Sequence, residues 1–250
     1  ILPIEKKKDK EKQHLLKQLI SPFILRRTKA EVLDELPEKT ELIVPVELSE
    51  EEMAIYENIR TRTLSGLQSE KINPIEALMA LTKLRQAACS PELIDKHLTI
   101  PSSKIRVFLE LVSELKENKH RALVFSQFTS FLALVRQALD KAGIEYLYLD
   151  GSVPAAQRKK LVETFQNGDM PLFLISLKAG GTGLNLTAAD YVIHLDPWWN
   201  PAVEDQASDR AYRIGQKRPV TIYKLISEKT LEQKILELHK TKKNLADALL

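Results

Sequence analysis

Three polar residues near the end of the chain, Gln206, Arg210 and Arg213, have side chains and spacing suited to phosphate chemistry. The Asn-Pro pair at 200–201 is a typical helix start, since proline is favoured at the first helical position. On one helix, spacings of four and three place all three side chains on the same face. Two guanidinium groups there can bind phosphate oxygens and offset the charge that develops in phosphoryl transfer. The alternative is a solvated helix face on which Asp209 pairs with Arg213.

A glycine-rich segment at residues 180–183 exposes successive backbone N–H groups, which suit a phosphate oxygen. It is not the loop that holds a nucleoside triphosphate with magnesium, because that loop needs a glycine followed directly by lysine. No glycine in this chain is followed by lysine. The histidines have no metal-ligand spacing, so we assign none of them to a metal. The sequence therefore predicts phosphate chemistry without a triphosphate loop of its own.

Short runs rich in β-forming residues must position these loops. Five such runs follow residue 120, at residues 122–125, 146–149, 172–176, 191–195 and 220–225. They are almost continuously hydrophobic, which is typical of strands buried on both faces of a parallel sheet. Helical patterns at 128–141 and 154–167 separate the first three. The pattern predicts an α/β fold, an open parallel sheet flanked by helices.

Polar, small and glycine residues follow the first four of these strands, in the segments 126–127, 150–152, 177–185 and 196–201. Ligands of open parallel sheets bind at the carboxyl ends of the strands. Ordinary turn chemistry explains any one of these loops. We interpret their accumulation at one edge of the sheet as a binding site.

Residues 1–98 differ from the rest, with one glycine, Gly66, and mostly helical patterns. A short β-branched run bounded by charge predicts a strand at 42–48. Ser49 and the three glutamates after it predict a helix to about residue 67, and Asn73-Pro74 predicts another that ends near Cys89. The shift in composition therefore predicts a boundary near residues 99–102.

Bulk composition limits the classes of protein. The net charge of +3 leaves nucleic-acid binding open. No apolar run approaches the roughly 18 residues that a membrane helix needs, and no hydrophobic leader follows the basic N-terminus. A single cysteine, Cys89, excludes an internal disulfide and fits a reducing compartment. Because the first residue is Ile1, we expect a fragment of a longer protein.

Taken together, these stretches resemble the second RecA-like lobe of superfamily-two helicases, in the SWI/SNF-type branch. Motif IV is similar to ALVFSQFTSFL (122–132), and the block after it to DGSVPAAQRKKLVETFQNG (150–168). Motif V with its extension is similar to ISLKAGGTGLNLTAADYVIHLDPWWNP (175–201), and motif VI to EDQASDRAYRIGQKRPVTIYKLI (204–226). The family's segment between lobes is similar to SPFILRRTKAEVLDELPEK (21–39). Motif VI with its RIGQ tail is the most specific of these.

The resemblance implies a role for each matched position. Arg210 and Arg213 would be arginine fingers that reach ATP with Mg²⁺, held mainly by a first lobe, while Gln206 would order the phosphate side of the cleft. Gly181 and Gly183 would let their loop approach DNA phosphate or the nucleotide. The implied DNA track consists of Ser126, Gln127, Ser152, Arg158, Lys178, Thr182 and Trp199. Trp198 would belong to the core.

The resemblance also implies an organisation and partners. Residues 1–40 would link two lobes, 41–98 would be a family-specific, mostly helical insertion with one strand, and 99–250 would be the second motor lobe. A C-terminal bracing helix would use an apolar stripe of Leu231, Ile235, Leu238, Leu245 and Leu249. The expected partners are double-stranded DNA and the first lobe of the same protein, with no membrane. The motif wording resembles prokaryotic members, which places the protein on DNA in the cytoplasm, or in the nucleus if it is eukaryotic.

Two other functions stay open. One is an RNA- or DNA-unwinding enzyme from another superfamily-two branch, and the other is a non-enzymatic DNA-binding module that kept only the fold. The RIGQ tail and the 41–98 helices favour a translocase, and both arginines remain. Stimulation of ATP hydrolysis by duplex DNA rather than RNA distinguishes the first two.

Overall fold

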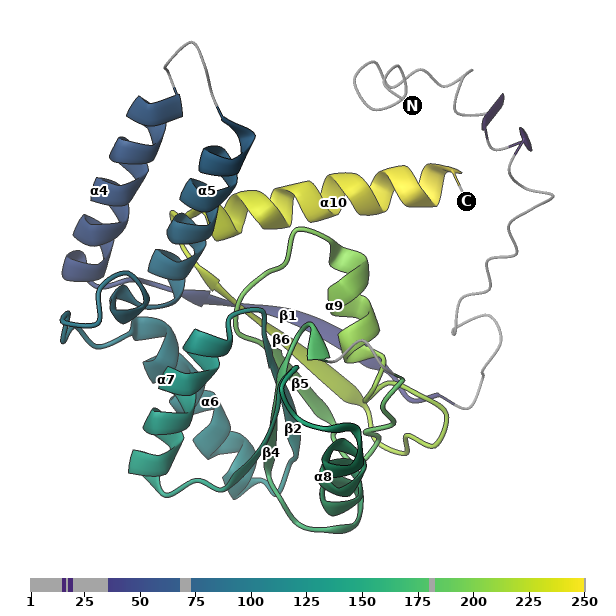
Figure 1. Ribbon diagram of the computed structural model, residues 1–250. Helices are drawn as coiled ribbons and strands as arrows, with labels where there is room; N and C mark the ends of the chain where they lie inside the picture. The colour runs from purple at the N-terminus through teal and green to yellow at the C-terminus, as the bar shows by residue number, and fades with distance from the viewer. Residues whose placement is uncertain (1–14, 17, 20–35, 68–72, 180–182, 250) are drawn as a thin grey trace.

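The computed structural model describes residues 15–16, 18–19, 36–67, 73–179 and 183–249, with the side chains of 243–249 excepted. Across these residues one sheet of six parallel strands forms, in the order β1-β6-β5-β2-β4-β3 (Figure 1). The strands are β1 (Lys39–Val46), β2 (Ala122–Ser126), β3 (Tyr146–Leu149), β4 (Leu172–Ser176), β5 (Tyr191–His194) and β6 (Val220–Ser227). The predicted α/β fold with an open parallel sheet is confirmed.

Helices cover both faces of the sheet. The helices α6 (Ser103–Glu117) and α7 (Thr129–Ala142) pack on one face, and α8 (Ala155–Asn167) and α9 (Pro201–Ser208) on the other. Within β2, alternate side chains enter opposite cores: Val124 joins the α6–α7 core and Phe125 the α8–α9 core. This two-sided burial is the physical reason for the continuous hydrophobicity of the strands.

The first helix of this layer, α6, was not expected from the sequence. Its N-cap is Ser102, whose hydroxyl accepts from the Ile105 N–H at 3.3 Å. Phe108, Val112 and Leu115 then recur at helical spacing and are buried. The cap and the apolar stripe were the signals available in the sequence.

A helical hairpin stands beside the sheet (Figure 1). It consists of α4 (Glu50–Leu67) and α5 (Pro74–Cys89), followed by the short η1 turn (Pro91–Leu93). These helices match the predicted ones. The buried Tyr56 of α4 packs with Leu84, Ala87 and Ala88 of α5 and with Leu231, the first residue of α10 (Leu231–Leu249).

Two expectations about the flanking elements need correction. The strand predicted at 42–48 is β1, and it pairs in parallel with β6, from Lys39 opposite Val220 to Val46 opposite Ser227. It is therefore the edge strand of the main sheet and not part of the helical insertion. An isolated strand leaves its backbone N–H and C=O groups unpaired, and in this fold β6 supplies the hydrogen-bond partners of β1.

In α10, Ile235 of the expected stripe is buried, but Leu238 is 48% exposed and lies off the packed face. The side chains of Leu245 and Leu249 lie outside the described residues. In the part of the chain that the structure describes, no helix has the length and apolarity to cross a membrane.

Candidate functional site

The two arginines of the candidate site do not share a helix with Gln206. Helix α9 begins at Pro201, with Asn200 as its cap, but it ends at Ser208. Arg210 and Arg213 lie in the turns that follow, so the single helix predicted for the three residues is wrong. The turns nevertheless bring them together, because all three border one pocket of about 290 Å³. Its lining residues are Gly183, Leu184, Gln206, Asp209, Arg210 and Arg213.

Backbone contacts hold the turn that carries the arginines. The Arg210 carbonyl accepts from the Leu186 N–H at 3.0 Å, which ties the turn to the segment after Gly183. Gln216 is buried, and its amide nitrogen lies 2.8 Å from the Ala189 carbonyl and 3.1 Å from the Ala211 carbonyl. The Gln216 oxygen accepts from the N–H groups of the next two residues, both at 2.9 Å. Gln216, the glutamine of the RIGQ tail, therefore stabilises the turn, a role that was not expected from the sequence.

Arg210 is a buried cation in the wall of this pocket. It is 5% exposed, and burial lowers the pKa of its guanidinium to about 10, which leaves it charged at neutral pH. Among the described residues its Nη1 has no hydrogen-bond partner. A buried, charged donor without a partner is costly unless an anion satisfies it. The arrangement suits a phosphate oxygen.

Arg213 lies at the open side of the same pocket. Its side chain is exposed, and Nη1 lies 3.5 Å from the carbonyl oxygen of Gly183. Gly183 is exposed, and an added Cβ there would meet nothing within 4 Å. Gly181 and Thr182 lie outside the described residues. The structure thus joins a buried and an exposed guanidinium in one pocket, with Gln206 exposed beside them.

Three residues of the expected DNA track lie in loops at the carboxyl ends of three strands. Lys178 is exposed after β4, and Ser152 is exposed after β3, where its hydroxyl donates to Asp150 at 2.6 Å. Gln127 is half-buried after β2, and its N–H lies 3.3 Å from an oxygen of Asp196. Parallel strands bring these loops to one edge of the sheet.

Two track residues have structural contacts that change their expected role. Ser126 is 1% exposed, and its hydroxyl donates to the buried Asp196, so it cannot contact DNA directly in this arrangement. The half-buried Arg158 donates from Nε to the Val153 carbonyl at 2.6 Å and from Nη2 to the Gly151 carbonyl at 3.1 Å. Arg158 therefore shapes the loop after β3. We retain Lys178, Gln127, Ser152 and the half-buried Trp199 as the candidates for direct contact.

The turn that carries both tryptophans is fixed by α9 and α10. The Trp198 N–H donates to Glu204 at 2.7 Å, and the Trp198 carbonyl contacts His239 Nε2. Lys242 donates to the Trp199 carbonyl at 2.9 Å. Both tryptophans are half-buried; Trp198 packs against the α8–α9 core, as expected, whereas Trp199 is not part of that core.

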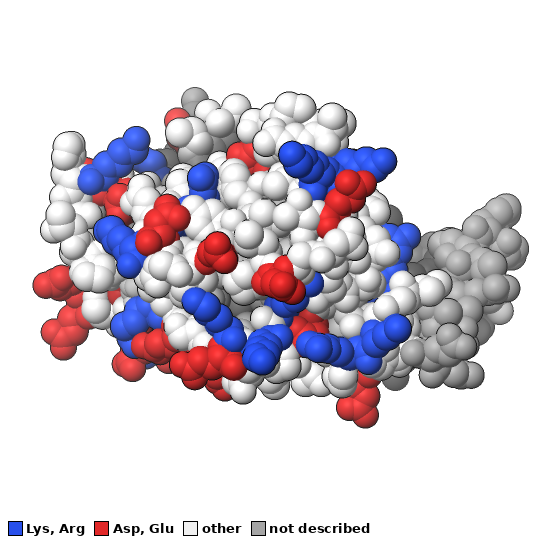
Figure 2. All heavy atoms as spheres, turned by 90° about the horizontal axis from the view of Figure 1, so that it is seen from below, with Lys and Arg blue, Asp and Glu red and all other residues white. Residues whose placement is uncertain are grey.

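Surface charge gives no simple guide to a ligand. The face in Figure 2 carries Lys and Arg side chains interspersed with Asp and Glu, and white surface separates the groups. Such mixing fits the small net charge of +3. On this face, a nucleic-acid site would therefore depend on particular loops and not on a broad basic patch.

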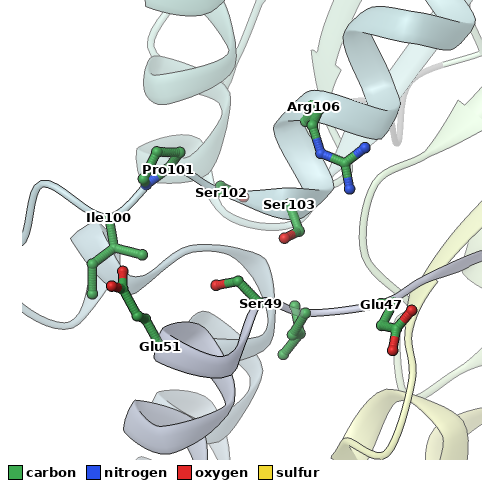
Figure 3. A pocket seen from close by; sticks show the side chains of 9 residues that line it. Glu47, Ser49, Glu51, Ile100, Pro101, Ser102, Ser103 and Arg106 are labelled. Carbon is green, nitrogen blue, oxygen red and sulfur yellow. The ribbon is translucent and has the colours of Figure 1, made fainter.

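A larger pocket, of about 450 Å³, lies between the start of α4 and the start of α6 (Figure 3). Ser49 and Ser103 border it, one from each helix start. Both are bonded to the buried Glu52, which accepts from the Ser49 N–H at 2.8 Å and from the Ser103 N–H at 2.9 Å. This carboxylate occupies the place where two helix N-termini favour an anion. We interpret this pocket as part of the structural contact between the helical hairpin and the sheet domain, and not as a ligand site.

The chain matches two family models. One is the "Helicase conserved C-terminal domain", over residues 103–215, and the other is the "SNF2-related domain", over residues 1–93. The first runs from the start of α6 to the turn of Arg213. The second ends just after α5 and so includes the hairpin.

Relatives and solved structures agree with these matches. The "Putative ATP-dependent helicase/translocase YwqA" of Bacillus subtilis is 41% identical over 100% of this chain and 28% of its own length. The "Sulfolobus solfataricus SWI2/SNF2 ATPase core in complex with dsDNA" is 35% identical, with a TM-score of 0.74 over 93% of this chain and 50% of that one. The "Sulfolobus solfataricus SWI2/SNF2 ATPase C-terminal domain" is 29% identical, with a TM-score of 0.69 over 85% of this chain and 90% of that one. The chain therefore spans about a quarter of the curated relative and nearly all of an isolated C-terminal domain.

Proposed function

Because the chain belongs to the SWI/SNF-type family of ATP-dependent helicases, we propose that it is the second motor lobe of an ATP-dependent translocase on double-stranded DNA. In this proposal the lobe acts with a first lobe of the same protein, and the motor remodels protein–DNA complexes. Its location is on DNA, in the cytoplasm of a prokaryote or the nucleus of a eukaryote.

One observation carries the catalytic part of the proposal. Arg210 is buried in the pocket wall, charged, and has a donor without a partner in the described part of the chain. Such a donor gains most when negative charge develops opposite it. Arg213, exposed at the same pocket, supplies a second guanidinium, and Gln206 orders the phosphate side of the cleft. Their geometry suits arginine fingers for a γ-phosphate.

The residues of this chain fit only one side of an ATP site. They supply cations but not the glycine-lysine loop that holds a triphosphate. Among the described residues, no group of three or more His, Cys, Asp or Glu gathers as a metal site would require. Mg²⁺, when bound with ATP, neutralises charge on the β- and γ-oxygens, and we assign its ligands to the first lobe. This chain then contributes charge stabilisation opposite that lobe.

Support for DNA comes from the strand-end loops and from a solved relative. That relative's title describes a complex with double-stranded DNA. Lys178, Gln127 and Ser152 lie at the same edge of the sheet, where backbone N–H groups and side chains can contact phosphates without reading sequence. We propose duplex DNA as the track for this reason.

The test uses the longer protein that joins this chain to its first lobe. Steady-state ATP hydrolysis is measured without nucleic acid, with duplex DNA and with RNA of equal length. We expect stimulation by duplex DNA only, and no turnover above background from the 250-residue chain alone. Stimulation by RNA favours the unwinding enzyme of another branch. Absence of turnover in the longer protein under every condition favours the non-enzymatic module.

A further inference from the structure

A single arginine links the helical hairpin to the tryptophan turn. Arg85 of α5 is 2% exposed, and its Nη2 donates to the Pro197 carbonyl at 2.6 Å. The same nitrogen lies 3.5 Å from an oxygen of Asp196, which is itself buried. Its guanidinium carbon is 5.2 Å from the ring centroid of Trp198 and 5.3 Å from that of Trp199. One side chain thus contacts four consecutive residues of the turn.

Asp196 extends this contact to a second strand end. Its carboxylate accepts from the Ser126 hydroxyl and lies 3.3 Å from the Gln127 nitrogen, at the end of β2. Arg85 also lies over the ring of Phe128, 5.3 Å from its centroid. Through Arg85, the helical hairpin therefore contacts both the loop after β2 and the loop after β5.

The turn leads directly into α9 and the phosphate pocket. Pro201 starts α9 two residues after Trp199, and Glu204 in the first turn of α9 accepts from the Trp198 N–H. Gln206 on this short helix borders the pocket, and Arg210 follows its end. The hydrogen bond from Trp198 to Glu204 links the turn to the first turn of the eight-residue α9, so we expect a shift of the tryptophan turn to move α9.

We infer that Arg85 is a positioning residue for the phosphate pocket, through which the helical hairpin sets the place of the Trp198–Trp199 turn and of α9. Arginine suits this role because its planar fork can meet a carbonyl and a carboxylate at once while it stacks on aromatic rings. Lysine keeps the charge but lacks the fork. The catalytic part of this inference rests on the proposed function, whereas the structural part does not.

The structural part has a direct optical reporter. The chain has two tryptophans, and both are in the turn. Trp emission and acrylamide quenching are measured for Arg85→Lys and Arg85→Met. Lys83→Met, an exposed position on the same helix, is the matched control. In both Arg85 variants we expect emission to shift to longer wavelength and quenching to increase, with no change in the control. Arg85→Lys retains the charge opposite Asp196, so the fluorescence measurement can still be made on this variant if Arg85→Met does not fold.

The catalytic part is measured in the longer protein with saturating duplex DNA. A pocket displaced by about 1 Å loses on the order of 10²-fold in rate, so we expect Arg85→Lys to lower kcat by about 10- to 100-fold. The KM for ATP should stay near that of the wild type, since the first lobe supplies most ground-state binding. A residue with only a structural role would lower the melting temperature and leave kcat of the folded protein unchanged.

The possible results are distinguishable. Wild-type emission and quenching in folded Arg85→Lys overturn the positioning of the turn. A spectral change with unaltered kcat overturns the link to the pocket. If the wild-type longer protein has no ATPase activity, the proposed function fails, and the fluorescence result still decides whether Arg85 positions the turn.

Discussion

The guanidinium of Arg210 lies over the ring of Phe125, with 5.7 Å between the guanidinium carbon and the ring centroid. Phe125 is 1% exposed, near the end of the central strand β2, and it is fixed by the α8–α9 core. Arg210, from the turn after α9, therefore packs on a buried residue of the central strand β2. Among the residues that the structure describes, its Nη1 has no hydrogen-bond partner, so a guanidinium fixed in this way suits the electrostatic role that we propose for it.

Substitution of either arginine should abolish most ATP turnover in the longer protein. An arginine finger contributes on the order of 10³–10⁵ in rate, because it stabilises charge that appears only in the transition state. We expect Arg210→Ala and Arg213→Ala to lower kcat by orders of magnitude and to change ATP affinity far less. Arg210→Lys should also be poor, since it lacks the planar fork. Steady-state ATPase with saturating duplex DNA, nucleotide binding and a melting curve provide the measurements.

The matched control for these substitutions is Arg106→Ala. Arg106 is an exposed arginine of α6 whose guanidinium pairs with Glu110 at 3.1 Å. Exposed pairs of this kind contribute about 1 kcal/mol or less, so turnover and melting should both stay near wild type. Near-normal turnover in a folded Arg210 or Arg213 variant would refute the finger assignment.

Lys178→Ala should weaken binding of the chain to duplex DNA without altering sequence preference. A lysine that contacts phosphate releases counterions, so its loss should also reduce the slope of log affinity against log salt by about 1. Arg158→Ala should act differently, because Arg158 donates to the carbonyls of Gly151 and Val153 and shapes its loop. We expect it to lower the melting temperature as well as the affinity. Affinity is measured by fluorescence anisotropy between low and moderate salt.

Lys234→Ala is the control for DNA binding. Lys234 is exposed on α10, outside the loops after β2, β3 and β4 that carry Gln127, Ser152 and Lys178, and pairs with Glu237 at 3.1 Å. If Lys234→Ala reduces the salt slope as much as Lys178→Ala, or if Lys178→Ala has no effect, the track is wrongly placed.

The sheet could be predicted from the sequence because burial on both faces requires strands that are hydrophobic at consecutive positions. Residues such as Leu123 and Val124 face opposite cores, and both must be apolar. The strand β1 was expected, but its partner was not, because pairing with β6 is a long-range contact. The helical spacing of Arg210 and Arg213 also led to a wrong prediction of one continuous helix, because spacing alone does not show that α9 ends at Ser208.

The support of the site was less predictable than its charged residues. Arg85 lies in α5, far along the chain from Asp196 and Trp198, and nothing in its local pattern distinguishes it from a solvated arginine. Ser126 appeared as a polar residue at a strand end, yet its hydroxyl is buried against Asp196. Such contacts depend on tertiary packing.

His194 should make the chain less stable below about pH 6.5. Burial lowers the pKa of this imidazole from 6.5 to about 3, so it stays neutral in the folded chain while the unfolded chain binds a proton. Between these two values the unfolded state holds more protons, and stability therefore falls as pH falls. At pH 5 the loss should be about 2 kcal/mol relative to pH 7.5, from about 1.4 kcal/mol per pH unit.

His194→Gln removes the titration and retains an amide near the Ser208 hydroxyl, which lies 2.9 Å from His194 Nε2. The difference in unfolding free energy between wild type and variant is measured by urea denaturation across this pH range. We expect that difference to narrow as pH falls. A constant difference at all pH values would show that His194 does not cause the acid sensitivity.

A buried ion pair between Lys104 of α6 and Glu232 of α10 should be essential for stability. Both residues are 0% exposed, and Lys104 Nζ lies 2.7 and 2.6 Å from the two carboxylate oxygens. Glu232 also accepts from the Ser227 N–H at 2.8 Å, so the pair joins α6, α10 and the end of β6. Removal of one partner leaves an uncompensated buried charge, at a cost of about 3–5 kcal/mol. We expect a loss of this size for Lys104→Met in urea unfolding.

The double variant separates the charge from the packing. Lys104→Met with Glu232→Gln removes both charges, and the glutamine oxygen can still accept from the Ser227 N–H, so most of the lost stability should return. The surface control is Lys159→Met, since the Lys159–Glu163 pair is 3.9 Å apart and its lysine side chain is 82% exposed. It should change stability by less than about 1 kcal/mol. If the double variant is as unstable as Lys104→Met, the loss comes from the packing of the lysine stem and not from the unpaired carboxylate.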